Sequence, residues 1–132
     1  MQLDLSGIPI LVVDDQQVAR ELLQRMLKRL GFSTVLEACD GTEAMQQATK
    51  HRPAMIFCDV HMRPEDGLTF LTKLRFEAPP VVRQTPVILV TSEERDEALE
   101  LSRQLRVSGY VVKPPSLTAV RMAASKALGM EV

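Results

Sequence analysis

Five short apolar runs, each followed by a longer stretch of mixed polarity, constrain the fold of this 132-residue chain more than any other feature. The runs are continuously apolar, which is typical of strands buried on both faces of a sheet. The stretches between them carry apolar residues at helical spacing. Strands that alternate with helices in this way predict a doubly wound α/β fold, with a parallel sheet covered on both faces. A closed eight-stranded barrel would need far more chain.

Local signals set the boundaries of these elements. The strands are expected at 8–13, 33–37, 54–58, 86–90 and 109–112, and the helices, with their capping residues, at about 16–30, 40–51, 66–77, 92–106 and from 116 onward. Gly31 is expected to end the first helix, and Asp40 with Glu43 forms a capping-box-like pair at the second. Ser92 and Ser116 are expected to cap the last two helices. The inward-facing positions of the fourth helix are expected to be Ala98, Leu101 and Leu105.

Polar side chains follow four of the five expected strands, at the point where each strand ends. They are Asp14 and Asp15 after the first strand, Asp59 after the third, Thr91 after the fourth and Lys113 after the fifth. The carboxyl ends of parallel strands lie at one edge of a sheet, which is where ligands bind in open α/β folds. We therefore expect these five side chains to converge on one site.

Three carboxylates that lie close together repel one another. The repulsion is relieved by a hard cation, by pairing with Lys113, or by taking up protons. Oxygen ligands without histidine nitrogen or thiolate suit Mg²⁺ better than Zn²⁺. Such a site can bring a phosphodonor to a carboxylate nucleophile, which would form an acyl phosphate on Asp59. The metal and Lys113 would neutralise the transferring oxygens, and Thr91 would donate a hydrogen bond to them.

Each of these residues also has a simpler interpretation. Taken singly, the aspartates could cap helices or face solvent, Thr91 could be a cap or turn residue, and Lys113 could be a surface lysine. The joint pattern decides in favour of a site, because matching groups at four separate strand ends are hard to reach by chance.

The charge balance and the distribution of apolar residues argue against several classes of function and location. The chain has 16 basic and 17 acidic residues, so its bulk charge gives no reason to expect binding to nucleic acid or to an anionic membrane. The N-terminus has no basic start typical of a signal peptide, and no apolar stretch approaches the roughly 20 residues that span a bilayer. We expect a cytoplasmic protein in which Cys39 and Cys58 are buried, reduced thiols.

Six short sequence motifs of this chain match a known family. They are I-L-V-V-D-D (10–15), E-A-C-D-G-T-E-A (37–44), C-D-V-H-M (58–62), D-G (66–67), P-V-I-L-V-T (86–91) and Y-V-V-K-P (110–114). Together they cover nearly the whole chain, and it resembles the receiver domains of two-component response regulators, especially small stand-alone ones of the chemotaxis type. The resemblance implies a bacterial protein with a flavodoxin-like sheet in strand order 2-1-3-4-5.

The resemblance also implies a role for each site residue. Asp59 matches the phosphoacceptor, and Asp14 and Asp15 match the acidic pair that holds Mg²⁺, with Asp15 the closer ligand. Asp59 and the backbone carbonyl of His61 would complete the set of protein ligands to this cofactor. The chain would act as a switch rather than an enzyme, with only self-phosphorylation from small donors and slow self-dephosphorylation.

The switch residues and the partners are implied in the same way. Thr91 and Lys113 match the groups that contact the phosphoryl group, and Tyr110 matches an aromatic that moves inward when the hydroxyl is drawn to the phosphate. The bond between Lys113 and Pro114 resembles one that is usually cis. The partners would be a histidine kinase or phosphotransfer protein and a downstream protein that binds residues of about 93–128. The protein would be a monomer or weak dimer.

The sequence departs from the family pattern near the site. Arg63 stands where proline is common and Pro64 follows it, so the shape of this loop is an open question. Glu65 stands where an apolar residue is usual and adds a charge near the metal loop. Ser92 is bulkier than the usual alanine or glycine, and it either narrows access to the phosphoryl group or caps the helix.

Three rival functions share the fold class. The first is a receiver-like scaffold that binds a partner without phosphorylation, which the complete acidic set disfavours. The second is a small aspartyl-phosphate hydrolase of the haloacid-dehalogenase type, whose D-x-D pattern after the first strand is replaced here by D-D-Q-Q (14–17). The third is a nucleotide-binding flavodoxin-like domain, which would need a phosphate-cradling loop where this chain has two aspartates. We expect residues 1–132 to form a single receiver domain with no output domain.

Overall fold

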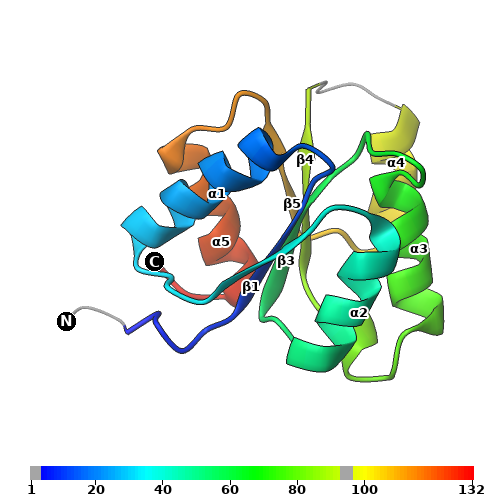
Figure 1. The fold of residues 1–132 in the computed structure, drawn as a ribbon, viewed down its shortest axis with the longest axis horizontal. Coiled ribbons are helices and arrows are strands. Elements are labelled where there is room, and N and C mark those ends of the chain that lie inside the picture. Colours follow the sequence, from blue (N-terminus) through cyan, green and yellow to red (C-terminus); the bar gives the residue numbers. More distant parts are fainter. Residues whose placement is uncertain (1–3, 93–96) are drawn as a thin grey trace.

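The computed structural model describes residues 4–92 and 97–132, in which strands and helices alternate along the chain (Figure 1). The strands are β1 (Ile10–Val13), β2 (Val35–Ala38), β3 (Met55–Asp59), β4 (Val87–Thr91) and β5 (Gly109–Val112). The helices are α1 (Gln17–Leu30), α2 (Gly41–His51), α3 (Gly67–Glu77), α4 (Glu97–Gln104) and α5 (Leu117–Leu128), with a short 3₁₀ turn, η1 (Val82–Gln84), before β4. Each strand lies within two residues of its expected bounds.

The five strands form one parallel sheet in the order β2-β1-β3-β4-β5. This order and the alternation with helices confirm the doubly wound, flavodoxin-like fold. The chain first moves outward from β1 to β2 and then crosses back to β3, so the reversal in strand order lies between β1 and β3. Ligand sites in open α/β sheets lie beside such a reversal.

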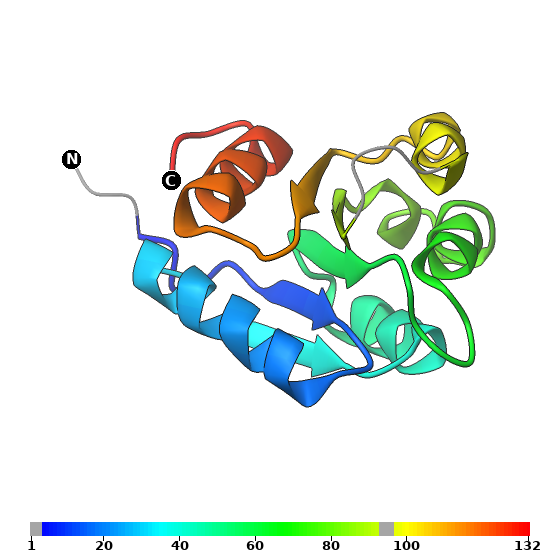
Figure 2. The ribbon, with the colours of Figure 1, turned by 90° about the horizontal axis from the view of Figure 1, so that it is seen from above.

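Helices cover both faces of the sheet (Figure 2). α1 and α5 pack on one face, where Leu27 and Val120 are fully buried against strand residues such as Phe57. α2 and α3 pack on the other face, where Phe70 and Leu71 are buried against the opposite sides of the same strands. The core is filled mainly by aliphatic side chains, as expected from the small share of aromatic residues in the sequence. No helix in the described ranges is both long enough and apolar enough to cross a membrane.

The expected helix ends are confirmed where the structure describes them. Gly31 ends α1 with a φ of 111°, a left-handed conformation that glycine adopts without steric cost. Asp40 accepts a hydrogen bond from the backbone N–H of Glu43 at 2.8 Å, and Asp66 caps α3 in the same way. Ser116 caps α5. These side chains satisfy backbone donors that lack partners within the helix.

The expectations for the fourth helix are only partly correct. The cap that we expected at Ser92 involves residues 93–96, which lie outside the described residues, as does the side chain of Ala98. Leu101 was expected to face inward but is 57% exposed. Leu105, directly after α4, is half-buried and packs against the core as expected, and the inner side of α4 carries the fully buried Ser102. A buried polar position of this kind is invisible to a pattern of apolar residues.

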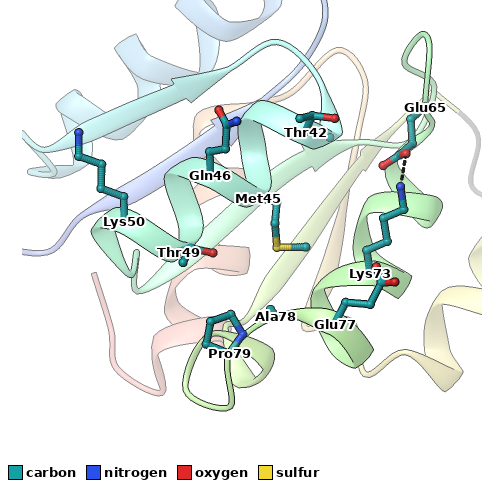
Figure 3. Close-up of a pocket in the computed structure, with 11 residues that line it drawn as sticks. Thr42, Met45, Gln46, Thr49, Lys50, Glu65, Lys73, Glu77, Ala78 and Pro79 are labelled. Carbon is teal, nitrogen blue, oxygen red and sulfur yellow. Dashed lines mark hydrogen bonds and ion pairs between the residues drawn. The ribbon is translucent and has the colours of Figure 1, made fainter.

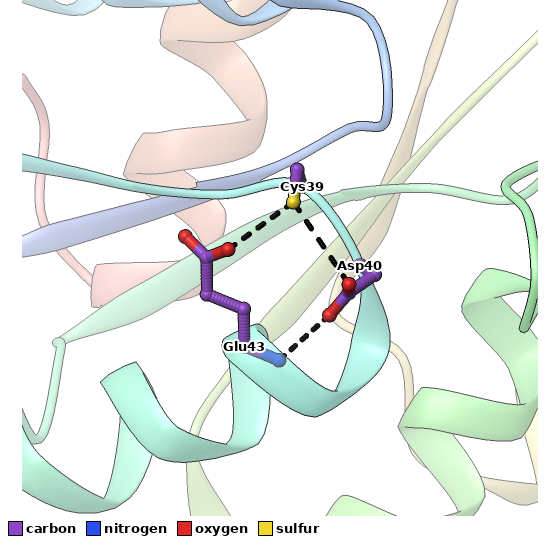
Figure 4. A group of neighbouring side chains, drawn as sticks. All are labelled: Cys39, Asp40 and Glu43. Atoms are coloured by element: carbon purple, nitrogen blue, oxygen red, sulfur yellow. Dashed lines mark hydrogen bonds between the residues drawn. The ribbon is translucent and has the colours of Figure 1, made fainter.

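The surroundings of Cys39 also correct the sequence prediction (Figure 4). Cys58 is buried as expected, whereas Cys39 is exposed. Its thiol lies 3.1 Å from Oε2 of Glu43, whose backbone N–H donates to Asp40 at the start of α2. The neighbouring Glu43 carboxylate raises the pKa of the Cys39 thiol, which disfavours the reactive thiolate.

A buried arginine ties α3 to two distant connections. Arg75 is 6% exposed, and all its hydrogen bonds within the described part of the chain go to backbone carbonyl groups. Its acceptors are the carbonyl oxygens of Arg83 and Thr85 before β4, both at 2.8 Å, and of Leu105 and Arg106 after α4, at 2.8 and 3.4 Å. Burial, with a contribution from nearby Arg106, lowers the pKa of Arg75 to about 10, so the guanidinium remains charged at neutral pH.

Candidate functional site

The predicted polar residues meet at the carboxyl edge of the sheet. Asp14 and Asp15 directly follow β1, Asp59 and Thr91 are the last residues of β3 and β4, and Lys113 directly follows β5. Three of them, Asp15, Asp59 and Lys113, line a hollow of about 460 Å³ together with residues of the loop after β3. The strand ends converge because all five strands run in the same direction.

The centre of the site is a group of three carboxylates with one lysine. Carboxylate oxygens of Asp14, Asp15 and Asp59 lie within 4.8 Å of one another. Nζ of Lys113 lies 3.0 Å from Oδ1 of Asp59 and 3.7 Å from Oδ2 of Asp14. Asp14 is 2% exposed and Asp59 is 4% exposed, so water screens little of the repulsion between them. One lysine only partly compensates three acidic groups.

One oxygen of Asp14 shows how the group could accept a cation. Oδ1 of Asp14 accepts a hydrogen bond from the backbone N–H of Gln16 at 2.9 Å. Oδ2 is buried and has no hydrogen-bond donor among the residues that the structure describes. An acceptor in this position is costly unless a cation or proton compensates it. The donor set consists of hard carboxylate oxygens, which fits Mg²⁺.

The burial of Asp14 also predicts that the folded protein becomes more stable when the charge of this carboxylate is removed. Burial is the main cause that raises the pKa of Asp14, and the nearby Asp59 adds to it. The folded state therefore holds a proton on this carboxyl more readily than the unfolded chain does. The stability that this proton contributes is fully present below the ordinary pKa of 3.8. It is lost as the pH rises through the raised pKa of Asp14 in the folded state.

We predict that Asp14→Asn stabilises the metal-free protein at pH 7. Removing the charge of a buried carboxylate that has one oxygen without a hydrogen-bond donor should raise the free energy of unfolding by about 1 kcal/mol. For a domain of this size, that corresponds to about 4 °C in Tm. Thermal denaturation in EDTA measures the shift, with Glu131→Gln at an exposed position as the control. The difference should shrink as pH falls toward 4. A lower Tm for Asp14→Asn at pH 7 would contradict the proposed cost of this carboxylate.

Asp15 and the loop after β3 are joined by a backbone contact. Oδ2 of Asp15 accepts a hydrogen bond from the backbone N–H of Arg63 at 3.3 Å. The side chain of His61 is exposed, and the residue lines the hollow. The bonds before Pro64 and Pro114 are both cis, which confirms the expectation for Lys113–Pro114. The exposed Ser92 also lines the hollow.

The two expected switch residues lie in different surroundings. Thr91 is 1% exposed at the end of β4, and its carbonyl accepts a hydrogen bond from the backbone N–H of Lys113 at 2.7 Å. Tyr110 lies one strand away on β5, and its hydroxyl is 2.7 Å from Oγ of Ser102 on α4. Tyr110 also lines a hollow of about 570 Å³ beside β5 and α5, together with Arg103 and Met122. It therefore contacts the helix next to the site rather than the acidic group.

Two residues that support the site were not recognised from the sequence. Nη1 of Arg20 donates to the carbonyl of Asp14 at 2.7 Å, while its Nε pairs with Glu37 at 3.1 Å, so it ties α1 to both β1 and β2. Gly67 begins α3 against the backbone at the end of β3, where a Cβ atom would collide with the carbonyl oxygen of Asp59. In the sequence, only the D-G pair at 66–67 indicates a role for Gly67. No sequence pattern indicates a role for Arg20, because its partners lie outside its own helix.

Comparison with known proteins agrees with this geometry. Residues 10–125 match the model of the response regulator receiver domain. The chain is 32% identical over 109 residues to the chemotaxis protein CheY-3 of Vibrio cholerae, which covers 83% of this chain and 82% of that protein. The fold matches the V. cholerae chemotaxis protein CheY4, with a TM-score of 0.83 and 27% identity over 92% of this chain and 98% of that one.

A third relative carries a metal. The receiver domain of the Pseudomonas aeruginosa sensor histidine kinase PA1611, solved with a magnesium ion coordinated in its active-site cleft, has a TM-score of 0.83 and 26% identity. The match covers 94% of this chain and 99% of that domain. Sequence motifs, strand order, acidic group and relatives all agree, and the chain belongs to the response regulator receiver domain family.

Proposed function

We propose that this chain is a phosphorylation switch that accepts a phosphoryl group on Asp59 with the help of Mg²⁺. The observation that carries the proposal is the acidic group with its lysine. Lys113 lies 3.0 Å from the Asp59 carboxylate, and beside them Asp14 presents a buried oxygen that no described donor satisfies. A purely structural ion pair would not require the third carboxylate of Asp15 at the same place.

The cation would be held by Asp14, Asp15, Asp59 and the backbone carbonyl of His61. When bound, it would neutralise charge on the oxygens of the transferring phosphoryl group. A carboxylate oxygen of Asp59 forms the new bond to phosphorus. The bond from phosphorus to the histidine nitrogen of a kinase, or to the acetate oxygen of acetyl phosphate, breaks, and the leaving group keeps the bonding electrons.

The remaining residues of the site bind the product and pass on the change. Lys113 stays beside the phosphoryl oxygens as a fixed positive charge, and Thr91 donates a hydrogen bond to them. Phosphorylation adds about −1.5 to −2 charge, so it biases the populations of two arrangements of the neighbouring elements. The contact between Tyr110 and Ser102 supports a path from β5 to α4, and hence to a protein partner that binds residues of about 93–128.

The proposal is tested by the intact mass of the protein after incubation with acetyl phosphate. We expect one labile phosphoryl adduct that requires both Mg²⁺ and Asp59, and no adduct on Asp59→Asn. Asp66→Asn serves as the matched control, because Asp66 is an exposed carboxylate beside the same hollow that we assign no role in phosphoryl transfer. An adduct that persists in Asp59→Asn would place the acceptor elsewhere. Absence of both adduct and Mg²⁺ binding in the wild-type protein would favour a phosphorylation-independent scaffold.

A further inference from the structure

The loop that connects β3 to α3 carries a glutamate whose two oxygens have separate surroundings. Oε2 of Glu65 accepts a hydrogen bond from Nζ of Lys73 on α3 at 2.7 Å (Figure 3). Oε1 lies against Gly41, the first residue of α2, where a Cβ atom would be only 2.5 Å from it. Glu65 thus reaches from the loop to the beginning of one helix and to the middle of the next.

The position of Gly41 is favourable for this approach. A side chain at residue 41 would displace the Glu65 carboxylate, so the glycine makes room for it. The beginning of a helix carries partial positive charge from its free N–H groups, which attracts a carboxylate. The hydrogen bond to Glu65 is also the main cause that raises the pKa of Lys73. The pair with Lys73 holds one oxygen of the Glu65 side chain, and the other lies close to the beginning of α2.

The other side of the same loop faces the acidic site. His61 and Arg63 line the site hollow, and the backbone N–H of Arg63 donates to Asp15. The Glu65–Lys73 pair lies on the opposite side, along a groove of about 660 Å³ between α2 and α3 that Met45 and Pro79 also line (Figure 3). The loop is therefore held between the acidic site on one side and Glu65 with its partners on the other.

We infer that Glu65 is a positioning residue that sets the affinity of the acidic site for Mg²⁺. It acts by fixing the loop in which His61 and Arg63 line the site hollow and Arg63 donates to Asp15. A half-exposed ion pair contributes little to global stability, roughly 0–1 kcal/mol. Small displacements of a ligand-bearing loop nevertheless weaken metal binding strongly, because coordination depends on the placement of each oxygen. The inference rests on the proposed function, since it concerns the same site.

The test compares Glu65→Ala, Lys73→Met and the double variant by calorimetric titration with MgCl₂. We expect Glu65→Ala to weaken Mg²⁺ binding by roughly 10-fold and Lys73→Met by no more than that. The double variant should be no weaker than Glu65→Ala, because Glu65→Ala already removes every contact of the Glu65 carboxylate. Glu65→Gln keeps a hydrogen-bond acceptor and should weaken Mg²⁺ binding less than Glu65→Ala does. Glu77→Gln removes another groove carboxylate on α3 and should leave the affinity unchanged. Tm should change little in every variant.

A second measurement separates this inference from the proposed function. The backbone amide signal of Arg63 in the metal-free protein reports the loop position whether or not the wild type binds Mg²⁺. We expect it to shift in Glu65→Ala and Lys73→Met and to stay in place in Glu77→Gln. An unmoved signal, or Mg²⁺ affinity equal to wild type in both single variants, would overturn the role of Glu65. A wild type that binds no Mg²⁺ while the signal still shifts would count against the proposed function alone.

Discussion

Replacement of Arg75 by methionine is expected to lower the free energy of unfolding by about 3 kcal/mol, because it leaves one buried and three partly buried carbonyl groups without this donor. Methionine keeps most of the aliphatic length of the side chain, so the loss comes mainly from the guanidinium. The carbonyl groups belong to the segment before β4 and to the connection after α4. A loss of this size corresponds to a decrease in Tm of about 10 °C for a domain of this length. Urea denaturation and thermal denaturation both measure it.

Arg103→Met is the matched control for this prediction. Arg103 has the same chemistry on α4, but its side chain is 70% exposed and lies 3.5 Å from the carboxylate of Glu100, which is also exposed. We expect this variant to stay within about 0.5 kcal/mol of the wild type. Equal stability of the Arg75 and Arg103 variants would mean that the carbonyl contacts of Arg75 contribute nothing to folding.

Gly67→Ala should damage both stability and phosphorylation. The added methyl group would meet the carbonyl oxygen of Asp59 and the Cα atom of Val60, both of which belong to the backbone and cannot rotate away. Overpacking of this kind costs about 1–3 kcal/mol. The displaced segment carries the acceptor, so we also expect adduct formation from acetyl phosphate to slow by at least about 10-fold, as for other small displacements of reacting groups.

Gly109→Ala is the control for the glycine prediction. Gly109 begins β5, and an added Cβ atom there would have no neighbour within 4 Å in the described part of the chain. This variant should fold and accept the phosphoryl group at the wild-type rate. If Gly67→Ala behaved like Gly109→Ala, the close packing of α3 against the acceptor strand would not constrain the site.

Much of the fold could be predicted from the sequence, because strands and caps are recorded in local patterns. The continuous apolar runs predicted the strands, and Asp40, Asp66 and Ser116 predicted helix starts that the structure confirms. The convergence of the acidic residues with Lys113 also followed from strand direction alone. Their roles in phosphoryl transfer stay predictions until the adduct is measured.

The remaining features depend on contacts between distant parts of the chain. Nothing in the spacing of Arg75 indicates that its partners lie at residues 83–85 and 105–106. Leu101 was misplaced because the inner side of α4 is set by a serine that meets Tyr110. Cys39 was expected inside because cysteine is commonly buried, yet here the end of β2 leaves it at the surface. Glu65 was noticed only as an unusual charge, since its partner Lys73 lies eight residues away.

The strand order has a consequence for where change is tolerated in this molecule. β3 is the middle strand, hydrogen-bonded on both sides and buried at all five positions, so Asp59, the proposed acceptor, lies on a central and fully buried strand. β5 is an outer strand with a free edge and only one fully buried residue, and it bears Tyr110. Under the proposed function, the phosphoryl group is accepted on a central strand, while the change is passed on by one of the two outer strands, which is hydrogen-bonded on one side only. We therefore expect substitutions on β5 to alter the output more than they alter phosphorylation.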